Sequence, residues 1–156
     1  MKETIRKTIL CAVMLTLVSL AASAQVKEFE RYSNAKNMTY VYISSYMLNL
    51  AGKAAAPSLP GVNTKALMGK LSGIQIISSD DPKASARLKS NTQAFVGNER
   101  YELLMQVDED CTKVRIYYRR SKQQSVVVMM NDMDGEVSVI VFSGSFTLDD
   151  VMKLRS

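Results

Sequence analysis

The sequence predicts an α+β fold, with helices packed on one face of a mostly antiparallel sheet. The first indication is the C-terminal half, where apolar and polar residues alternate in runs at 101–107, 114–118, 126–130 and 137–142. Four such runs with short connections are typical of an antiparallel meander. The second indication is helical spacing in 82–95, where Ala84, Leu88, Asn91 and Phe95 recur on one side. A helix that lies between isolated strands and a meander favours a fold of two layers, with helices packed on a sheet.

The first 24 residues predict a secretory signal peptide. Lys2, Arg6 and Lys7 precede an uncharged apolar run, and Ala22 and Ala24 then form an A-x-A site that predicts cleavage before Gln25. A transmembrane anchor is the alternative, but the strongly apolar part is about 13 residues, short of the ~20 that span a bilayer. We therefore expect a periplasmic or secreted protein with no stable membrane anchor after cleavage.

Residues 25–156 then form one α+β domain, since their number is typical of a single core. Loss of the first 24 residues takes 20 basic and 15 acidic residues to 17 and 14, a net charge of +3. This mild charge gives no case for nucleic acid as a partner.

The elements before the meander are less regular. Residues 39–44 (TYVYIS) predict a strand, followed by a short helix capped by Ser44 or Ser45; a single helix over 37–51 also fits the spacing. Residues 52–61 predict a loop. After it, Asn63 or Thr64 can cap a short helix carrying Leu67, Met68 and Leu71.

Three further elements have clear signals. Residues 74–77 (IQII) predict a strand, and Asp81 with Pro82 predicts the start of the following helix. At the C-terminus, residues 147–150 (TLDD) match a capping box. The last helix is expected to use an apolar side made of Leu148, Val151, Met152 and Leu154.

The charged turns raise the question of a cation site. Asp134-Gly135 predicts a tight hairpin turn, and the spacing around it lacks the side-chain ligands of an EF-hand at positions 1 and 12. In a meander, the first and third turns share one end of the sheet. Residues 108–110 (DED) and 132–136 (DMDGE) should therefore gather there, with Arg119, Arg120 and Lys122 at the other end. Solvated turns and a weak cation site both remain open.

No catalytic, cofactor-binding or metal-ligating residue is predicted, and no cofactor. The chain has no histidine, which excludes Ser-His-Asp and Cys-His catalysis and His-based zinc sites. Cys111 is the single cysteine after cleavage and reads as a half-buried thiol at a strand end, with an intermolecular disulfide or a reactive thiol as the alternative. The pairs Asp80-Asp81 and Asp149-Asp150 read as helix caps. Met129, Met130 and Met133 read as packing residues, with an adaptable binding surface or a soft copper site as the alternative.

The sequence resembles the domain of unknown function 4252 family of small exported proteins from Gram-negative bacteria. The resemblance runs from about Phe29 to Leu154, and four segments carry it: 41–44 with 47–48, 74–78, 101–105 and 144–150. It implies an envelope protein, with some members linked to envelope sigma-factor regulation, and it transfers no site residues.

The function expected from these features is a non-enzymatic binding or interaction module of the envelope, in envelope sensing, with an unidentified envelope protein as partner. The alternative is a small-ligand-binding protein, or a hydrolase using carboxylates, with a cleft near the 52–61 loop. A homo-oligomer, joined by sheet edges or through Cys111, is also open.

Overall fold

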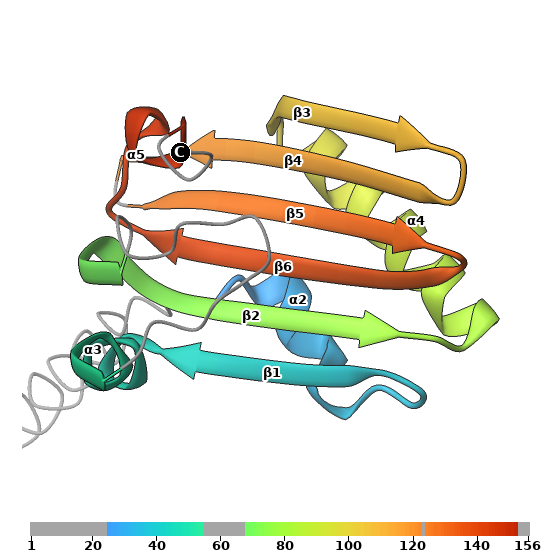
Figure 1. Cartoon of the computed structure of the whole chain (residues 1–156), viewed down its shortest axis with the longest axis horizontal. Coiled ribbons are helices and arrows are strands. Elements are labelled where there is room, and N and C mark those ends of the chain that lie inside the picture. Colours follow the sequence, from blue (N-terminus) through green and yellow to red (C-terminus); the bar gives the residue numbers. More distant parts are fainter. Residues whose placement is uncertain (1–24, 55–67, 123, 153–156) are drawn as a thin grey trace, which may run out of the picture.

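The computed structural model describes residues 25–54, 68–122 and 124–152. These residues form a six-stranded antiparallel sheet in the order β1-β2-β6-β5-β4-β3 (Figure 1). The expected α+β class and the C-terminal meander β3–β6 are confirmed. The strands are β1 (Thr39–Ser44), β2 (Leu71–Ser79), β3 (Glu102–Glu109), β4 (Thr112–Arg120), β5 (Ser125–Met133) and β6 (Glu136–Gly144).

One face of the sheet is covered by α2 (Lys27–Glu30), η2 (Arg31–Asn34) and α4 (Pro82–Asn98), which lie behind the sheet in Figure 1. α4 carries the chain from β2 across the sheet to the opposite edge strand, β3. The core under these helices is fully apolar at its centre, with Phe29, Leu88, Ile77, Val128 and Val139 each 0% exposed. Burial of this cluster is what holds the helices to the sheet.

α4 begins as the sequence predicts. The Asp81 carboxylate accepts a hydrogen bond from the Ala84 backbone N–H at 2.8 Å, and Pro82 occupies the first turn. This satisfies one of the donors that a helix start leaves without a partner. The expected docking face is also present, since Ala84 and Leu88 are buried and Phe95 packs against the cluster.

The opposite face is covered at one end by α3 (Ser45–Ala54), η4 (Met68–Lys70) and α5 (Leu148–Met152). Its core holds buried Leu48, Phe142, Phe146 and Val151. The sequence did not indicate this second layer, because Ile140 and Phe142 alternate with the valines of the first core and read as solvent-facing. Phe142 is instead 1% exposed.

The strand reading of residues 39–44 is confirmed, and the single helix over 37–51 is wrong. Each residue of β1 pairs with β2 in an unbroken register, from Thr39 opposite Ser78 to Ser44 opposite Gly73. The Ser44 hydroxyl then accepts a hydrogen bond from the Met47 backbone N–H at 3.3 Å, so the predicted cap begins α3. Pairing with a central strand therefore outweighs the helical spacing of this segment.

β2 is longer than expected, and Leu71 lies in it rather than in a helix. Residues 68–70 form only a 3₁₀ turn. The helix start expected at Asn63 or Thr64, and most of the loop expected over 52–61, lie outside the described residues.

The two chain ends are described in part. The signal peptide over 1–24, with Ala22 and Ala24, lies outside the described residues, which begin at Gln25. In the described part of the chain, no helix has the length and apolarity to cross a membrane. The capping box of α5 is present: the Asp150 carboxylate accepts from the Thr147 backbone N–H at 2.9 Å, and Asp150 N–H donates to Thr147 Oγ1 at 3.3 Å.

The apolar side expected for α5 is only partly correct. Val151 is buried, whereas Leu148 is 40% exposed and Met152 is 63% exposed. Leu154 lies outside the described residues. A helix of five residues is too short to bury more than one side chain against the sheet.

Candidate functional site

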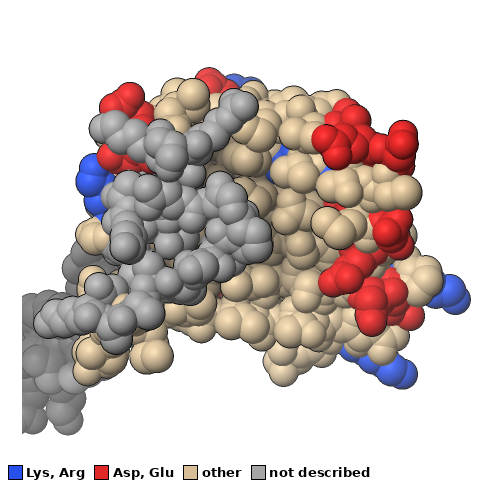
Figure 2. Space-filling view, viewed as in Figure 1, with Lys and Arg blue, Asp and Glu red and all other residues tan. Residues whose placement is uncertain are grey.

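Acidic residues gather at one end of the sheet, as the meander predicts. This acidic end comprises the β3–β4 and β5–β6 turns and the end of β2, and it forms the red patch at the right of Figure 2. The Asp134 backbone N–H donates to the Cys111 carbonyl at 3.0 Å, so the two turns contact each other directly. Positive φ angles at Asp134 (52°) and Gly135 (85°) confirm a tight hairpin turn.

Two of these acids are paired with cations on the helix-covered side. Lys89 of α4 contacts Asp132 at 2.5 Å, and Arg115 contacts Asp108 at 3.6 Å. Five other carboxylates form no ion pair with the described residues: Asp80, Glu109, Asp110, Asp134 and Glu136. The acidic end therefore carries a local negative charge on a chain whose net charge is +5.

The acidic end does not form a metal centre among the described residues. Within them, no three Asp, Glu or Cys side chains converge as metal ligands. An open hollow of about 660 Å³ lies beside the end of β2 and is lined by Asp80, Asp81 and Glu136 together with polar groups of residues 37–39 and 78–79. None of the three carboxylates is buried, and Asp81 is already used as a helix cap.

An apolar stripe crosses the sheet beside the acidic end, on the face that carries α3 and α5. The strand registers align one residue of every strand into a single row: Val41, Ile76, Ile140, Met129, Ile116 and Met105. Val41 is 41% exposed, and the other five are partly exposed. Adjacent strands lie about 4.8 Å apart, so the stripe is roughly 24 Å long.

The rows on either side of the stripe differ sharply. Towards α3 and α5, the next row contains Ile43, Ile74, Phe142, Val127 and Tyr118, which belong to the second core. Towards the acidic end, the next row is mainly polar, with Ser78, Ser138 and Asn131. This face therefore changes from buried apolar, through partly exposed apolar, to polar and then acidic. Figure 2 shows uncharged surface beside the acids on this face.

Cations lie at the other end of the sheet, as expected for Arg119, Arg120 and Lys122. The Arg119 guanidinium contacts the Glu99 carboxylate at 2.5 Å and lies 5.6 Å from the centre of the Tyr101 ring. Burial raises the pKa of Tyr101 to about 12, with Arg119 opposing that shift. Tyr101 and Arg119 line a hollow of about 310 Å³ beneath the start of α2.

Within the pair Asp149-Asp150, Asp150 acts as the predicted helix cap. The ammonium of Lys70 contacts Asp150 at 2.8 Å and, with the Thr147 backbone N–H, lowers the pKa of Asp150 to about 2. This ion pair joins α5 to the residue that precedes β2.

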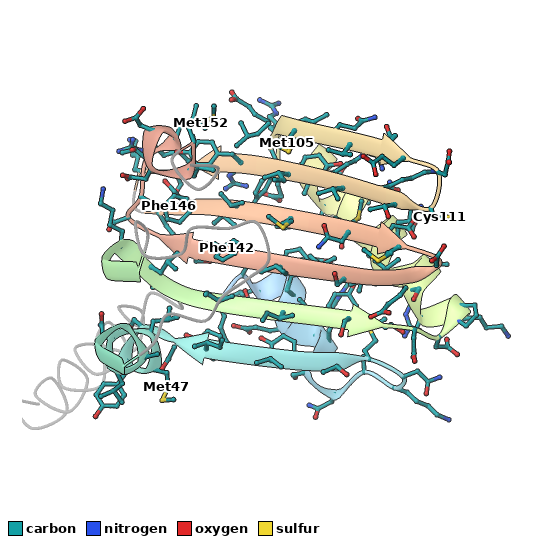
Figure 3. The ribbon with its side chains drawn as sticks, viewed as in Figure 1. Met47, Met105, Cys111, Phe142, Phe146 and Met152 are labelled. Atoms are coloured by element: carbon teal, nitrogen blue, oxygen red, sulfur yellow. The ribbon has the colours of Figure 1, made fainter. Side chains whose placement is uncertain are left out.

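Met129, Met130 and Met133 do not form one cluster. Met130 is 2% exposed in the first core, Met129 lies in the apolar stripe on the opposite face, and Met133 is 56% exposed. Alternation along β5 places Met130 on the opposite face from Met129 and Met133, so the three do not form one surface. Cys111 is exposed at the β3–β4 turn (Figure 3), so the expectation of a half-buried thiol is wrong.

The sequence reading missed the apolar stripe. Its members come from six strands, and only their pairing register places them in one row. The signal in the sequence is a second set of apolar residues that alternate with first-core residues along the same strands, of which Ile76 and Ile140 are the clearest.

The fold and this surface define a small α+β protein in which the described helices cover one sheet face and leave the other partly open. The family model described as Domain of unknown function (DUF4252) matches residues 32–154, and the chain belongs to this family. No curated protein matches it. Among solved structures it is similar to PA94 of Pseudomonas aeruginosa, a protein of unknown function described as a candidate regulator. The two share 10% identity over 78% of this chain and 77% of that one, with a TM-score of 0.33, which supports no argument about function.

Proposed function

We propose that this protein is a non-enzymatic binding module, exported to the bacterial envelope, that captures a protein partner on its open sheet face. The observation that carries the proposal is the apolar stripe beside five unpaired carboxylates. Both features lie on surface that the described helices leave uncovered. Val41 is exposed and the other five stripe residues are partly exposed, and contiguous apolar surface that stays accessible marks interaction sites.

The same surface indicates the chemistry of the partner. An apolar strip on the partner would cover Ile76, Ile140 and Met129, and Lys or Arg residues beside it would face the acidic end. Opposite charges across an interface orient the partner and accelerate association. The hydrogen bonds of strands β2, β6, β5 and β4 fix the stripe in place, so little order has to be gained on binding.

The alternative function requires a cleft with buried carboxylates. The buried polar side chains of the described residues are Gln75, Ser79, Ser85, Thr92, Ser125 and Ser143, none of which is a carboxylate. The loop expected to roof that cleft lies mainly outside the described residues. The described geometry therefore supports binding at the open face better than it supports this alternative.

Site-specific photo-crosslinking in the native envelope tests the proposal. A photoreactive amino acid replaces Met129 in the stripe, and the matched control replaces Lys83, which is exposed on α4 behind the sheet. We expect a discrete crosslinked protein from position 129 and none from position 83. Equal labelling from both positions, or none from position 129, would contradict binding at the open face.

A charge reversal within one strand tests the role of the acidic end. Glu109→Lys places a cation at the acidic end, whereas Glu102→Lys makes the same change at the other end of β3. We expect Glu109→Lys to reduce crosslinking from position 129 by about tenfold, the effect of ~1.4 kcal/mol in binding. Glu102→Lys should leave it unchanged. Identical effects of the two variants would remove the acidic end from the binding surface.

A further inference from the structure

The two edges of the sheet differ in how well they are protected against pairing with another strand. Edge strands present unpaired backbone N–H and C=O groups, and proteins block them with charges, prolines and bulges. β3 has such devices: Glu102, Asp108 and Glu109 lie on it, and its register shifts between Leu103 and Met105.

β1 has none of these devices. Its six residues pair with β2 without a register shift, and they include neither a proline nor a charged residue. The uncharged stretch continues on both sides of the strand, from Asn37 to Gly52. No backbone hydrogen bond joins residues 39–43 to a described segment other than β2.

Exposed apolar side chains flank this same edge. Val41 of β1 is 41% exposed, and on α3 Tyr46 is 71%, Met47 54% and Leu50 49% exposed. Figure 3 shows Met47 projecting past β1, away from the sheet. Large exposed apolar side chains beside an open backbone edge are typical of a surface that is covered by a further strand.

We propose that β1 pairs antiparallel with β1 of a second copy of this chain, with the two-fold axis at Val41. A second copy fits because the edge carries no charge, so two chains of net charge +5 meet there without like charges in contact. At the other edge, self-pairing would bring the acidic residues of β3 close to one another.

The register follows from the faces of the strand. A two-fold axis perpendicular to the sheet keeps each side chain on its own face, so residues of equal parity must pair. With the axis at Val41, the two Val41 side chains meet, and Tyr40 of each copy lies opposite the partner's Tyr42. This pairing joins the two apolar stripes into one continuous row across twelve strands, which a register centred on Tyr42 does not achieve.

The oligomeric state of the purified protein, expressed from the full sequence, tests this proposal. We expect sedimentation to show a concentration-dependent dimer with or without reductant. Val41→Lys should raise the dimer dissociation constant by about tenfold or more, because two ammonium groups then face each other. The matched control, Leu103→Lys, alters a residue of the other edge that is 50% exposed, against 41% for Val41, and should leave the dimer unchanged.

Covalent trapping tests the register. In a Cys111→Ser background, Val41→Cys should form an intersubunit disulfide under mild oxidation, since directly opposed residues in antiparallel strands have the Cα separation that a disulfide needs. Leu103→Cys should not. The trapped protein should also protect alternate backbone amides of 39–44 from hydrogen exchange.

Several outcomes would overturn the proposal: a monomer at millimolar concentration, a dimer that reductant dissolves, or a dimer weakened by Leu103→Lys and not by Val41→Lys. If Val41→Lys fails to fold, Met47→Glu provides the second test beside the edge, and an unchanged dimer there counts against β1. The proposal is independent of the binding function. Dimerisation is measured on the purified protein without a partner, and crosslinking from position 129 can be measured for the monomer or the dimer.

Discussion

Single polar residues attach the N-terminal segment to the sheet. Gln75, on β2, is 1% exposed. Its side-chain oxygen accepts from the Val26 backbone N–H at 2.8 Å, and its amide nitrogen donates to the Val26 carbonyl at 3.3 Å and to the Tyr40 hydroxyl at 3.1 Å. These partners compensate for the burial of the amide. Without them, burial of the amide would lower the free energy of unfolding by about 1–3 kcal/mol. Gln75 therefore fixes where the chain enters the fold.

Tyr101 makes the free energy of unfolding depend on pH in the alkaline range. Its pKa is about 12 in the folded protein, against an ordinary value of 10, so the folded state keeps the proton more tightly than the unfolded state. The stabilisation is complete below pH 10 and is lost as pH rises from 10 to 12. The free energy of unfolding should fall between pH 9 and pH 11 in both proteins. We expect this fall to be about 1 kcal/mol smaller in Tyr101→Phe than in the unmodified protein.

The measurement is urea denaturation of both proteins at the two pH values. Tyr101→Phe keeps the ring that packs on Phe95 and under Arg119, so the two proteins differ mainly in the phenol proton. Equal losses in the two proteins would show that Tyr101 ionises as a solvated phenol.

At the scale of elements, Gly144 makes a tight backbone contact between two strands. A Cβ atom at this position would lie 2.1 Å from the Lys70 carbonyl oxygen and 2.9 Å from the Leu71 Cα. The end of β6 thus lies directly against the start of β2, where the register between them shifts. Only a residue without a side chain allows this approach.

Substitution of two glycines measures that contact. Gly144→Ala must push β2 from β6, and we expect it to lower the free energy of unfolding by about 1–3 kcal/mol. Gly97→Ala, in α4, meets nothing within 4 Å and should raise it by about 0.5–1 kcal/mol, since alanine favours helix. Denaturant unfolding of the two variants gives both values. A Gly144→Ala variant as stable as Gly97→Ala would mean that β2 and β6 are not in contact there.

The sequence predicts most of the helices and strands, but less of how they pair and pack. The Asp81-Pro82 start of α4, the Asp134-Gly135 turn and the meander are local patterns, and all three are confirmed. The expectation that Leu71 lies in a helix is wrong, because pairing with β6 extends β2 to include it. The acidic end was predictable because adjacent strands alternate in direction. The apolar stripe was not, since it depends on five separate registers.

At the scale of the whole molecule, one sheet serves two hydrophobic cores. Leu88 of α4 belongs to the core behind the sheet, and Phe146 belongs to the core under α3 and α5. β2, β5 and β6 contribute buried residues to both cores, with Ile77 and Ile74 as the example on β2. Removal of either core therefore weakens the same strands, and the described body should unfold as one unit.

Leu88→Ala and Phe146→Ala test this unity. Each leaves a cavity at a fully buried site, and we expect losses of about 2–5 kcal/mol for Leu88→Ala and 3–5 kcal/mol for Phe146→Ala. Each variant should show one transition, coincident by far-UV circular dichroism and tyrosine fluorescence. The two side chains lie on opposite faces of the sheet and share no contact. In the double variant, which is kept folded by a stabilising osmolyte, the two losses of unfolding free energy should therefore add within about 0.5 kcal/mol. An early separate transition in Phe146→Ala alone would show that the α3 and α5 end unfolds independently, and the open face would then not be a rigid surface.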